Sequence, residues 1–151
     1  HGNGTQGIFW QRSDVLTVSI HGHPRTTYPF FTGFADESGE GEGRGFNHNF
    51  PLEEKCGSDT ISRTLEKAAG LIARFSPRFL VVSLGYDTMR GDPTGSFDLG
   101  PEDLKRTGRT LAETGITMLV VQEGGYSLRN LRSGSRMFVR GVAGVLTDKL
   151  M

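Results

Sequence analysis

Three short segments of this sequence carry side chains that could perform chemistry. They are residues 1–9 (HGNGTQGIF), residues 83–93 (SLGYDTMRGDP) and residues 122–126 (QEGGY). The carboxylate of Asp87 is a suitable ligand for zinc. The hydroxyl of Tyr126 could stabilise a developing oxyanion, and the preceding Gly124 and Gly125 would let a substrate approach the backbone closely. These residue types are compatible with metal-assisted hydrolysis.

Each segment also has an ordinary structural explanation. An aspartate that follows a strand is often a turn or helix-capping residue. Gly124-Gly125 could be only a tight turn, and Tyr126 a packed aromatic with its hydroxyl at the surface. His1, at the chain terminus, would then be disordered. The residues alone therefore leave both interpretations open.

The predicted secondary structure places these residues at the ends of strands. Nearly continuous apolar runs predict strands at 15–20, 79–85 and 117–122, of the kind that lie in parallel sheets covered on both faces. Helical patterns begin at Ser58, at Pro101 (with Gly115 as the C-cap) and at about Ser127. Alternating strands and helices predict an α/β fold with one mainly parallel sheet. The two segments that contain Asp87 and Tyr126 then share the sheet edge where such folds bind ligands.

Two long stretches, residues 21–50 and 87–100, show no regular pattern and are predicted to be loops near that edge. Glycines alternate with acidic residues at 39–45. A dinucleotide fingerprint would require a strand before it and a helix after it, and acidic side chains would repel a pyrophosphate. We therefore expect residues 39–45 to form a surface loop.

Composition limits the partners and the compartment. Among 151 residues, 17 basic and 17 acidic side chains cancel, so no strong field would attract nucleic acid or an anionic membrane. Cys56 is the single cysteine, which excludes an internal disulfide and favours a reducing, cytoplasmic location. The apolar runs are too short to cross a bilayer.

The order of the motifs adds a family resemblance. HGNGTQ is followed by VSIHGHP and YPFFTGFADESG, then by VVSLGYDTMRGDP and VQEGGY. This series, over nearly all of residues 1–146, resembles the second half of the histone deacetylase and acetylpolyamine amidohydrolase family. The sequences of the motifs are more similar to those of the acetylpolyamine enzymes. The resemblance implies that residues 1–151 are the C-terminal part of a single deacetylase domain with a partial three-layer arginase/deacetylase fold.

The resemblance also assigns roles to residues. Asp87 matches an aspartate that binds zinc, and Tyr126 matches the catalytic tyrosine that polarises the scissile carbonyl. Phe31 resembles an aromatic that lines the acyl-substrate tunnel, so we expect Asp87 and Tyr126 to open onto one cleft with Phe31 on its wall. His1 matches the neighbour of a histidine ligand, which would itself precede this chain, as would the tandem histidines that act as acid and base.

A potassium ion is a second metal that the resemblance implies. The Ser19 side chain and the Ile20 carbonyl match part of one site. Carbonyls at four further positions resemble a second site: Phe9, Arg12, Val15 and Phe46. Carbonyl and hydroxyl oxygens are suitable ligands for such a cation.

The implied activity is zinc-dependent hydrolysis of N-acetyl amides, with an acetylpolyamine, an acetyl-lysine or a related acetylated amine as substrate. With Asp87 as the only matched zinc ligand, we expect the isolated chain to bind zinc poorly and to be essentially inactive. An exposed sheet would favour homo-oligomers or other association. The alternative is a non-catalytic remnant or interaction module that keeps part of the deacetylase fold. A third option, a dinuclear manganese hydrolase, would require more Asp and His ligands than we find in the sequence.

Overall fold

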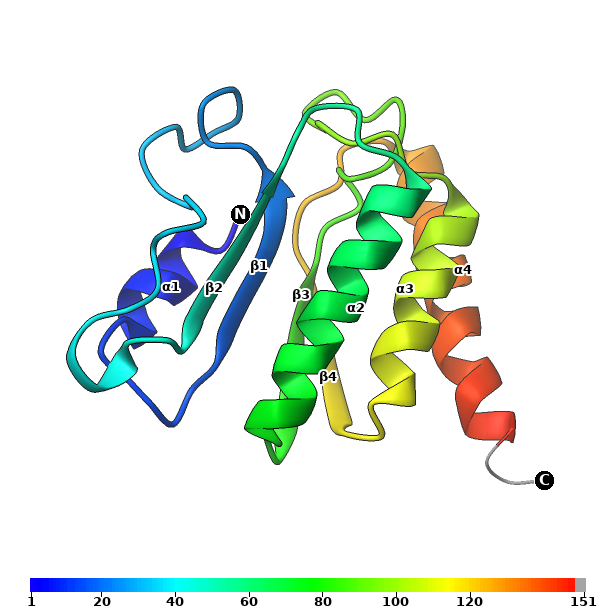
Figure 1. Cartoon of the computed structure of the whole chain (residues 1–151). Coiled ribbons are helices and arrows are strands. Elements are labelled where there is room, and N and C mark those ends of the chain that lie inside the picture. The colour runs from blue at the N-terminus through cyan, green and yellow to red at the C-terminus, as the bar shows by residue number, and fades with distance from the viewer. Residues whose placement is uncertain (149–151) are drawn as a thin grey trace. The chain divides into compact units, whose positions relative to one another are not determined.

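The computed structural model describes residues 1–148 and divides them between two compact units (Figure 1). Unit 1 is His1–Glu54 and unit 2 begins at Lys55. Both units contain parallel strands and helices, which confirms the predicted α/β class. No helix in the described part of the chain is long and apolar enough to cross a membrane.

Unit 1 contains helix α1 (Asn3–Phe9), strand β1 (Thr17–Gly22), a short 3-10 helix η1 (Gly41–Gly43) and strand β2 (Asn47–Leu52). The two strands pair in parallel, with Thr17 opposite Asn47 and Gly22 opposite Leu52. Of these elements, only β1 was predicted. The sequence of β2, NHNFPL, has no apolar alternation, and that of α1 has no apolar stripe.

Side-chain hydrogen bonds explain why these unpredicted elements form. The Oε1 atom of Gln6 on α1 accepts from the Nδ2 atoms of Asn47 (3.1 Å) and Asn49 (2.8 Å) on β2. Its Nε2 atom donates to Glu37 Oε2 (2.6 Å) and to Thr32 Oγ1 (3.1 Å). All three amide side chains are buried, where unpaired polar groups would be costly. This polar network therefore holds α1 and β2 against the connecting loop.

Unit 2 contains α2 (Ser58–Phe75), β3 (Phe79–Leu84), α3 (Pro101–Glu113), β4 (Thr117–Gln122) and α4 (Leu128–Asp148). Strands β3 and β4 pair in parallel, with Phe79 opposite Thr117 and Leu84 opposite Gln122. All five elements were predicted. Gly115 has the positive φ of 71° expected of a helix-ending glycine, although α3 itself ends at Glu113 with Thr114 as the C-cap.

The three helices of unit 2 lie side by side (Figure 1) and bury an apolar core. Helices α3 and α4 approach so closely that a Cβ atom built on Gly141 would lie 2.0 Å from the carbonyl oxygen of Lys105. Leu128, the first residue of α4, is 83% exposed. The apolar core side chains of the helices are Ile61, Leu65, Ala68, Ile72, Leu104, Leu111, Phe138 and Val145.

Within each unit the hydrogen-bond ladder joins two strands, β1 with β2 and β3 with β4. That the strands of both units share one sheet stays a prediction, but one expectation about coverage was wrong. Strands β3 and β4 were expected to be covered on both faces, yet Phe79, Val81 and Leu119 are each at least 60% exposed in the described chain. Unit 2 therefore presents an apolar sheet face, which is the surface through which we expected association.

Candidate active site

The loops that follow β3 and β4 bring the segments of Asp87 and Tyr126 together. Beyond the paired strands, Glu123 N donates to Leu84 O (3.0 Å) and Tyr86 N donates to Gly124 O (2.9 Å). Strand pairing thus continues into both loops, at the C-terminal edge where open α/β sheets place their sites.

The carboxylate of Asp87 lies between two glycines. A Cβ atom built on Gly124 would lie 2.1 Å from Oδ2, and one built on Gly85 would lie 2.5 Å from Oδ1. Any side chain at Gly124 would therefore displace the carboxylate. Gly125 has a φ of +134°, and a Cβ atom built on it would lie 3.0 Å from Tyr86 Cβ. The backbone conformation and the close packing therefore both favour glycine at this position.

The environment of Asp87 disfavours its charged form. Burial of the half-buried carboxyl raises its pKa, and the nearby negative charge of Asp92 raises it further. Within residues 1–148 no side chain donates a hydrogen bond to this carboxylate. A cation bound to the ionised carboxylate would offset the cost of burying its charge.

Asp92 holds the loop of Tyr126 in place. Its Oδ2 atom accepts from the backbone N–H groups of Tyr126 (2.8 Å) and Ser127 (3.0 Å). Its Oδ1 atom accepts from the N–H and the hydroxyl of Thr94, both at 3.1 Å. Burial acts to raise the pKa of Asp92, but these hydrogen bonds outweigh burial and lower it. Asp92 lies in the segment 83–93, and no role was predicted for it from the sequence; the structure makes Asp92 a positioning residue.

Tyr126 is 64% exposed, so a ligand can reach this residue from solvent. The start of α4 behind it is fixed by Asn130, which is buried and donates from Nδ2 to the carbonyl of Arg90 (3.2 Å). The structure therefore places Asp87 and Tyr126 on two neighbouring, tethered loops. That they open onto one cleft stays a prediction.

The other candidate residues lie in unit 1. Ser19 and Ile20 are on β1, and Ser19 Oγ is 2.7 Å from Nδ1 of His21. His21 Nε2 is 2.9 Å from the carbonyl oxygen of Gly33, which can only accept, so this nitrogen carries the proton. Burial lowers the pKa of His21, which favours the neutral ring; in that form Nδ1 accepts from Ser19. The lone pairs of Ser19 Oγ thus stay available to a cation such as potassium.

Sequence reasoning assigned no role to His21, although a histidine at the end of an apolar strand was a signal. His1, which could have been a free terminus, packs its ring 4.1 Å from that of His21 and accepts at Nδ1 from Asn3 N (3.1 Å). Gly33, with a φ of +102°, faces both rings, because its Cβ would lie 2.0 Å from His1 Nε2. Phe31, in the same loop, is exposed.

The second set of potassium candidates flanks the start of β1. The carbonyl of Phe9 accepts from Arg12 N (3.0 Å), and the carbonyl of Phe46 accepts from Thr17 N (2.9 Å). Arg12 and Val15 lie between α1 and β1. Because Phe9 and Phe46 already have protein donors, neither carbonyl requires a cation, and this potassium site stays a prediction.

A catalytic zinc ion needs three protein ligands and an open position. Among residues 1–148 no three His, Cys, Asp or Glu side chains cluster closely enough to hold a metal. Asp87 could contribute one ligand, but the described residues do not form a zinc site by themselves.

Parallel strands flanked by helices, with an aspartate and a tyrosine in the loops after neighbouring strands, make this an α/β protein with a candidate site at the C-terminal ends of β3 and β4. The Histone deacetylase domain matches residues 1–142, and the chain belongs to this family.

Sequence and structural similarity to individual deacetylases supports this assignment. Over 144 residues the chain is 46% identical to Acetylpolyamine amidohydrolase 1 of Pseudomonas aeruginosa, and the match covers 95% of this chain and 42% of the relative. It is 37% identical to Histone deacetylase 15 of Arabidopsis thaliana, over 95% of the chain and 27% of the relative. The crystal structure of acetylpolyamine aminohydrolase from Burkholderia pseudomallei matches with a TM-score of 0.93 and 38% identity, over 96% of this chain and 42% of that chain. The chain thus spans less than half the length of these relatives.

Proposed function

We propose that this chain provides the Asp87 and Tyr126 portion of a zinc-dependent site that hydrolyses N-acetyl amides. Its substrate class is an acetylated amine, such as an acetylpolyamine or acetyl-lysine, in keeping with the names of the relatives. The observation that carries the proposal is the half-buried carboxylate of Asp87, enclosed by Gly85 and Gly124 beside the loop of Tyr126. Zinc, when bound, polarises the acetyl carbonyl and lowers the pKa of a bound water.

In this proposal each residue has a separate task. Asp87 binds the metal through its carboxylate. The hydroxyl of Tyr126, an exposed residue, donates a hydrogen bond to the carbonyl oxygen as negative charge develops on it. Asp92 keeps the Tyr126 backbone in position, and Phe31 lines the substrate path. Ser19 contributes to a structural potassium site.

The 151-residue chain by itself should be a poor zinc protein. One carboxylate competes weakly with water and buffer for the ion, and no cluster of three ligands occurs among the described residues. Equilibrium dialysis against zinc should show weak binding, and assays on acetyl-lysine and acetylpolyamine should show no turnover. Turnover by the purified chain that Asp87→Ala abolishes would contradict this account.

A chimaera tests the proposed function directly. In it, this chain replaces the matched part of Acetylpolyamine amidohydrolase 1, which contributes the remaining 58% or so of its own length. We expect the chimaera to bind zinc and to deacetylate acetylpolyamine. Asp87→Ala should abolish both properties, whereas Tyr126→Phe should keep zinc binding and lower kcat by about 100-fold or more.

The matched control is Asp59→Ala, which removes an exposed carboxylate from the start of α2 and should change neither property. A chimaera that binds zinc but never hydrolyses substrate would favour the alternative, a non-catalytic module. Full activity in the Asp87→Ala chimaera would exclude Asp87 as a ligand.

A further inference from the structure

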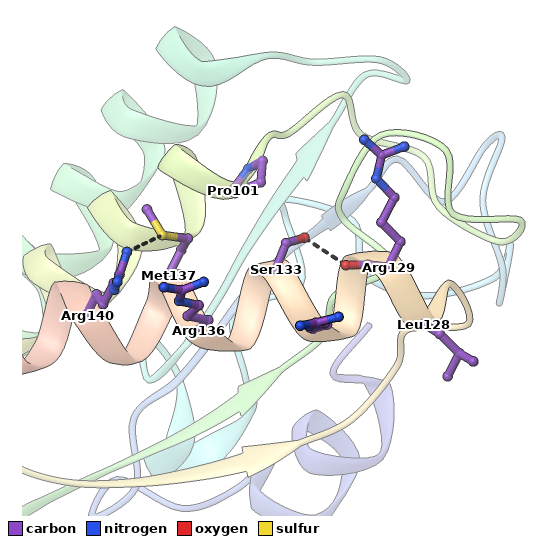
Figure 2. Close-up of a pocket in the computed structure, with 8 residues that line it drawn as sticks. Pro101, Leu128, Arg129, Ser133, Arg136, Met137 and Arg140 are labelled. Atoms are coloured by element: carbon purple, nitrogen blue, oxygen red, sulfur yellow. Dashed lines mark hydrogen bonds between the residues drawn. The ribbon is translucent and has the colours of Figure 1, made fainter.

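Helix α4 carries a row of four exposed arginines, which we call the arginine stripe: Arg129, Arg132, Arg136 and Arg140. At 3.6 residues per turn, spacings of three, four and four residues place them within an arc of about 80° and over about 16 Å of helix. They line a pocket of about 630 Å³ together with Leu128, Ser133 and Met137 of α4 and Pro101 of α3. Figure 2 shows the labelled arginines projecting from one stretch of α4, with Pro101 on the neighbouring helix.

The charges of the arginine stripe are not neutralised within the described residues. The ion pairs of unit 2 join Arg90, Lys105, Arg106 and Arg109 to carboxylates outside α4. Helix α3 packs against α4, but Glu102, Asp103 and Glu113 pair with basic residues of α3 itself. Like charges spaced i, i+4 destabilise a helix, so Arg132, Arg136 and Arg140 oppose folding unless an anion binds there.

The stripe is bordered by apolar side chains. Leu128, Met137 and Pro101 lie within the pocket, and Val139 and Leu146 are exposed farther along α4. An occupant that matches this surface therefore combines several negative charges with apolar groups.

This combination distinguishes among the possible ligands. A single phosphate is too small to meet guanidinium groups spread over about 16 Å. Single-stranded nucleic acid would use aromatic residues for base stacking, and the pocket lining contains none. The chain also has a formal net charge of zero, so it lacks the general field that gathers long polyanions. An acetylated polyamine is cationic and would be repelled.

We propose that the arginine stripe binds an acidic amphipathic helix of a partner protein. Successive arginines of the stripe are about 4.5–6 Å apart along the axis. A row of Glu or Asp residues at i, i+3 and i+4 on another helix has the same spacing. Arginine pairs with carboxylates in a bidentate manner, and apolar residues of the partner would cover Leu128 and Met137. This helix-on-helix recognition is independent of the proposed hydrolysis.

The test uses the 151-residue chain and a labelled synthetic helix in a fluorescence anisotropy titration. The helix carries four Glu residues in the spacing of the stripe and Leu residues beside them. A second peptide replaces each Glu by Gln. We expect the Glu peptide to bind at least about tenfold more tightly than the Gln peptide, and its affinity to fall as salt is raised.

Two charge-reversal variants locate the binding surface. Arg132→Glu/Arg136→Glu should weaken binding of the Glu peptide by at least about tenfold. Arg63→Glu/Lys67→Glu makes the same charge change on the exposed side of α2 and should leave affinity within about twofold. Because reversal could perturb α4, Arg132→Gln/Arg136→Gln should give an intermediate loss, with the circular dichroism of each variant compared with the parent.

Three results would overturn the proposal. The first is equal binding of the Glu and Gln peptides, and the second is equal loss in the α2 variant. The third is displacement of the peptide by a DNA duplex or by inorganic polyphosphate that binds more tightly to the stripe, which would make it a phosphate site.

Discussion

The interiors of the two units contain different types of residue. The buried residues of unit 1 are glycines, prolines, His21 and the amide side chains Gln6, Asn47 and Asn49, whereas every buried large apolar residue of the described chain lies in unit 2. Apolar packing depends on volume and tolerates similar substitutes. A buried amide network depends on every donor meeting its acceptor. The fold of unit 1 thus depends on the geometry of its hydrogen bonds, and the fold of unit 2 depends on the volume of its apolar core side chains.

The candidate sites are also held in place differently in the two units. In unit 2, backbone pairing beyond β3 and β4 and the anchor Asp92 position the loops of Asp87 and Tyr126. In unit 1, side-chain hydrogen bonds from Ser19 through His21 to Gly33 position the candidate potassium ligand. The loops of Asp87 and Tyr126 should keep their positions when a core side chain of unit 2 is replaced by another of similar size. The position of Ser19 should change when a hydrogen-bonding side chain of unit 1 is replaced.

The largest effect is expected in the apolar core of unit 2. Phe138 is almost fully buried, and Phe138→Ala should lower the free energy of unfolding by about 3–5 kcal/mol because it leaves a cavity. Urea denaturation measures this loss. The exposed neighbour Val139 is the control, and Val139→Ala should cost no more than about 0.5 kcal/mol. A loss below about 1 kcal/mol for Phe138→Ala would show that the packing of α4 contributes little to the stability of the core.

Asp92→Ala should have the next largest effect, a loss of about 2–3 kcal/mol at pH 7, because four hydrogen bonds to a charged group disappear. The folded-state pKa of Asp92 is lowered, so its stabilisation is present above the unfolded-state pKa and is lost as pH falls through the folded-state value. Urea denaturation at several pH values should show the parent and the variant converging in acid. Asp36→Ala, at an exposed carboxylate, should show no such convergence, and a constant difference for Asp92→Ala would contradict its charge-dependent role.

Gln6→Ala should destabilise unit 1 by about 1–2 kcal/mol, because Asn47, Asn49 and Glu37 each lose a partner. Hydrogen exchange should show the loss in the amides of β1 and β2, while those of β3 and β4 change little. Gln11→Ala removes an exposed amide and is the control. Equal loosening of both units would contradict the difference between their interiors.

The smallest effect concerns Asp87. Its folded-state pKa is raised by burial, so its contribution to stability is fully present below the unfolded-state pKa and is lost as pH rises through the folded-state value. Asp87→Asn should therefore stabilise the metal-free chain at pH 7 by about 0.5 kcal/mol, a small value because the group is partly solvated. Thermal unfolding at pH 7 and at pH 3 should show this gain only at pH 7. Asp36→Asn should have no effect at either pH, and destabilisation by Asp87→Asn at pH 7 would mean that the carboxylate is satisfied within the chain.

Local pattern predicted unit 2 well and unit 1 poorly. The apolar runs of β3 and β4 and the stripe of α2 reveal their structure within a short window of sequence. Helix α1 and strand β2 do not, since Gln6 meets Asn47 and Asn49 only after the chain has folded across some forty residues. The same reason explains the site. Asp87 and Tyr126 follow recognisable strands, whereas the role of Asp92 depends on a bond to a residue 34 positions later.

The glycines on either side of the Asp87 carboxylate limit how this chain can change by mutation. A Cβ at Gly124 would lie 2.1 Å from one carboxylate oxygen, and a Cβ at Gly85 would lie 2.5 Å from the other. Every amino acid that a single base change can produce from a glycine codon carries a Cβ atom, so neither position has a neutral intermediate while the carboxylate keeps its place. In a lineage of such sequences, these two codons should change only synonymously until the aspartate itself is lost, and from then on they should drift freely.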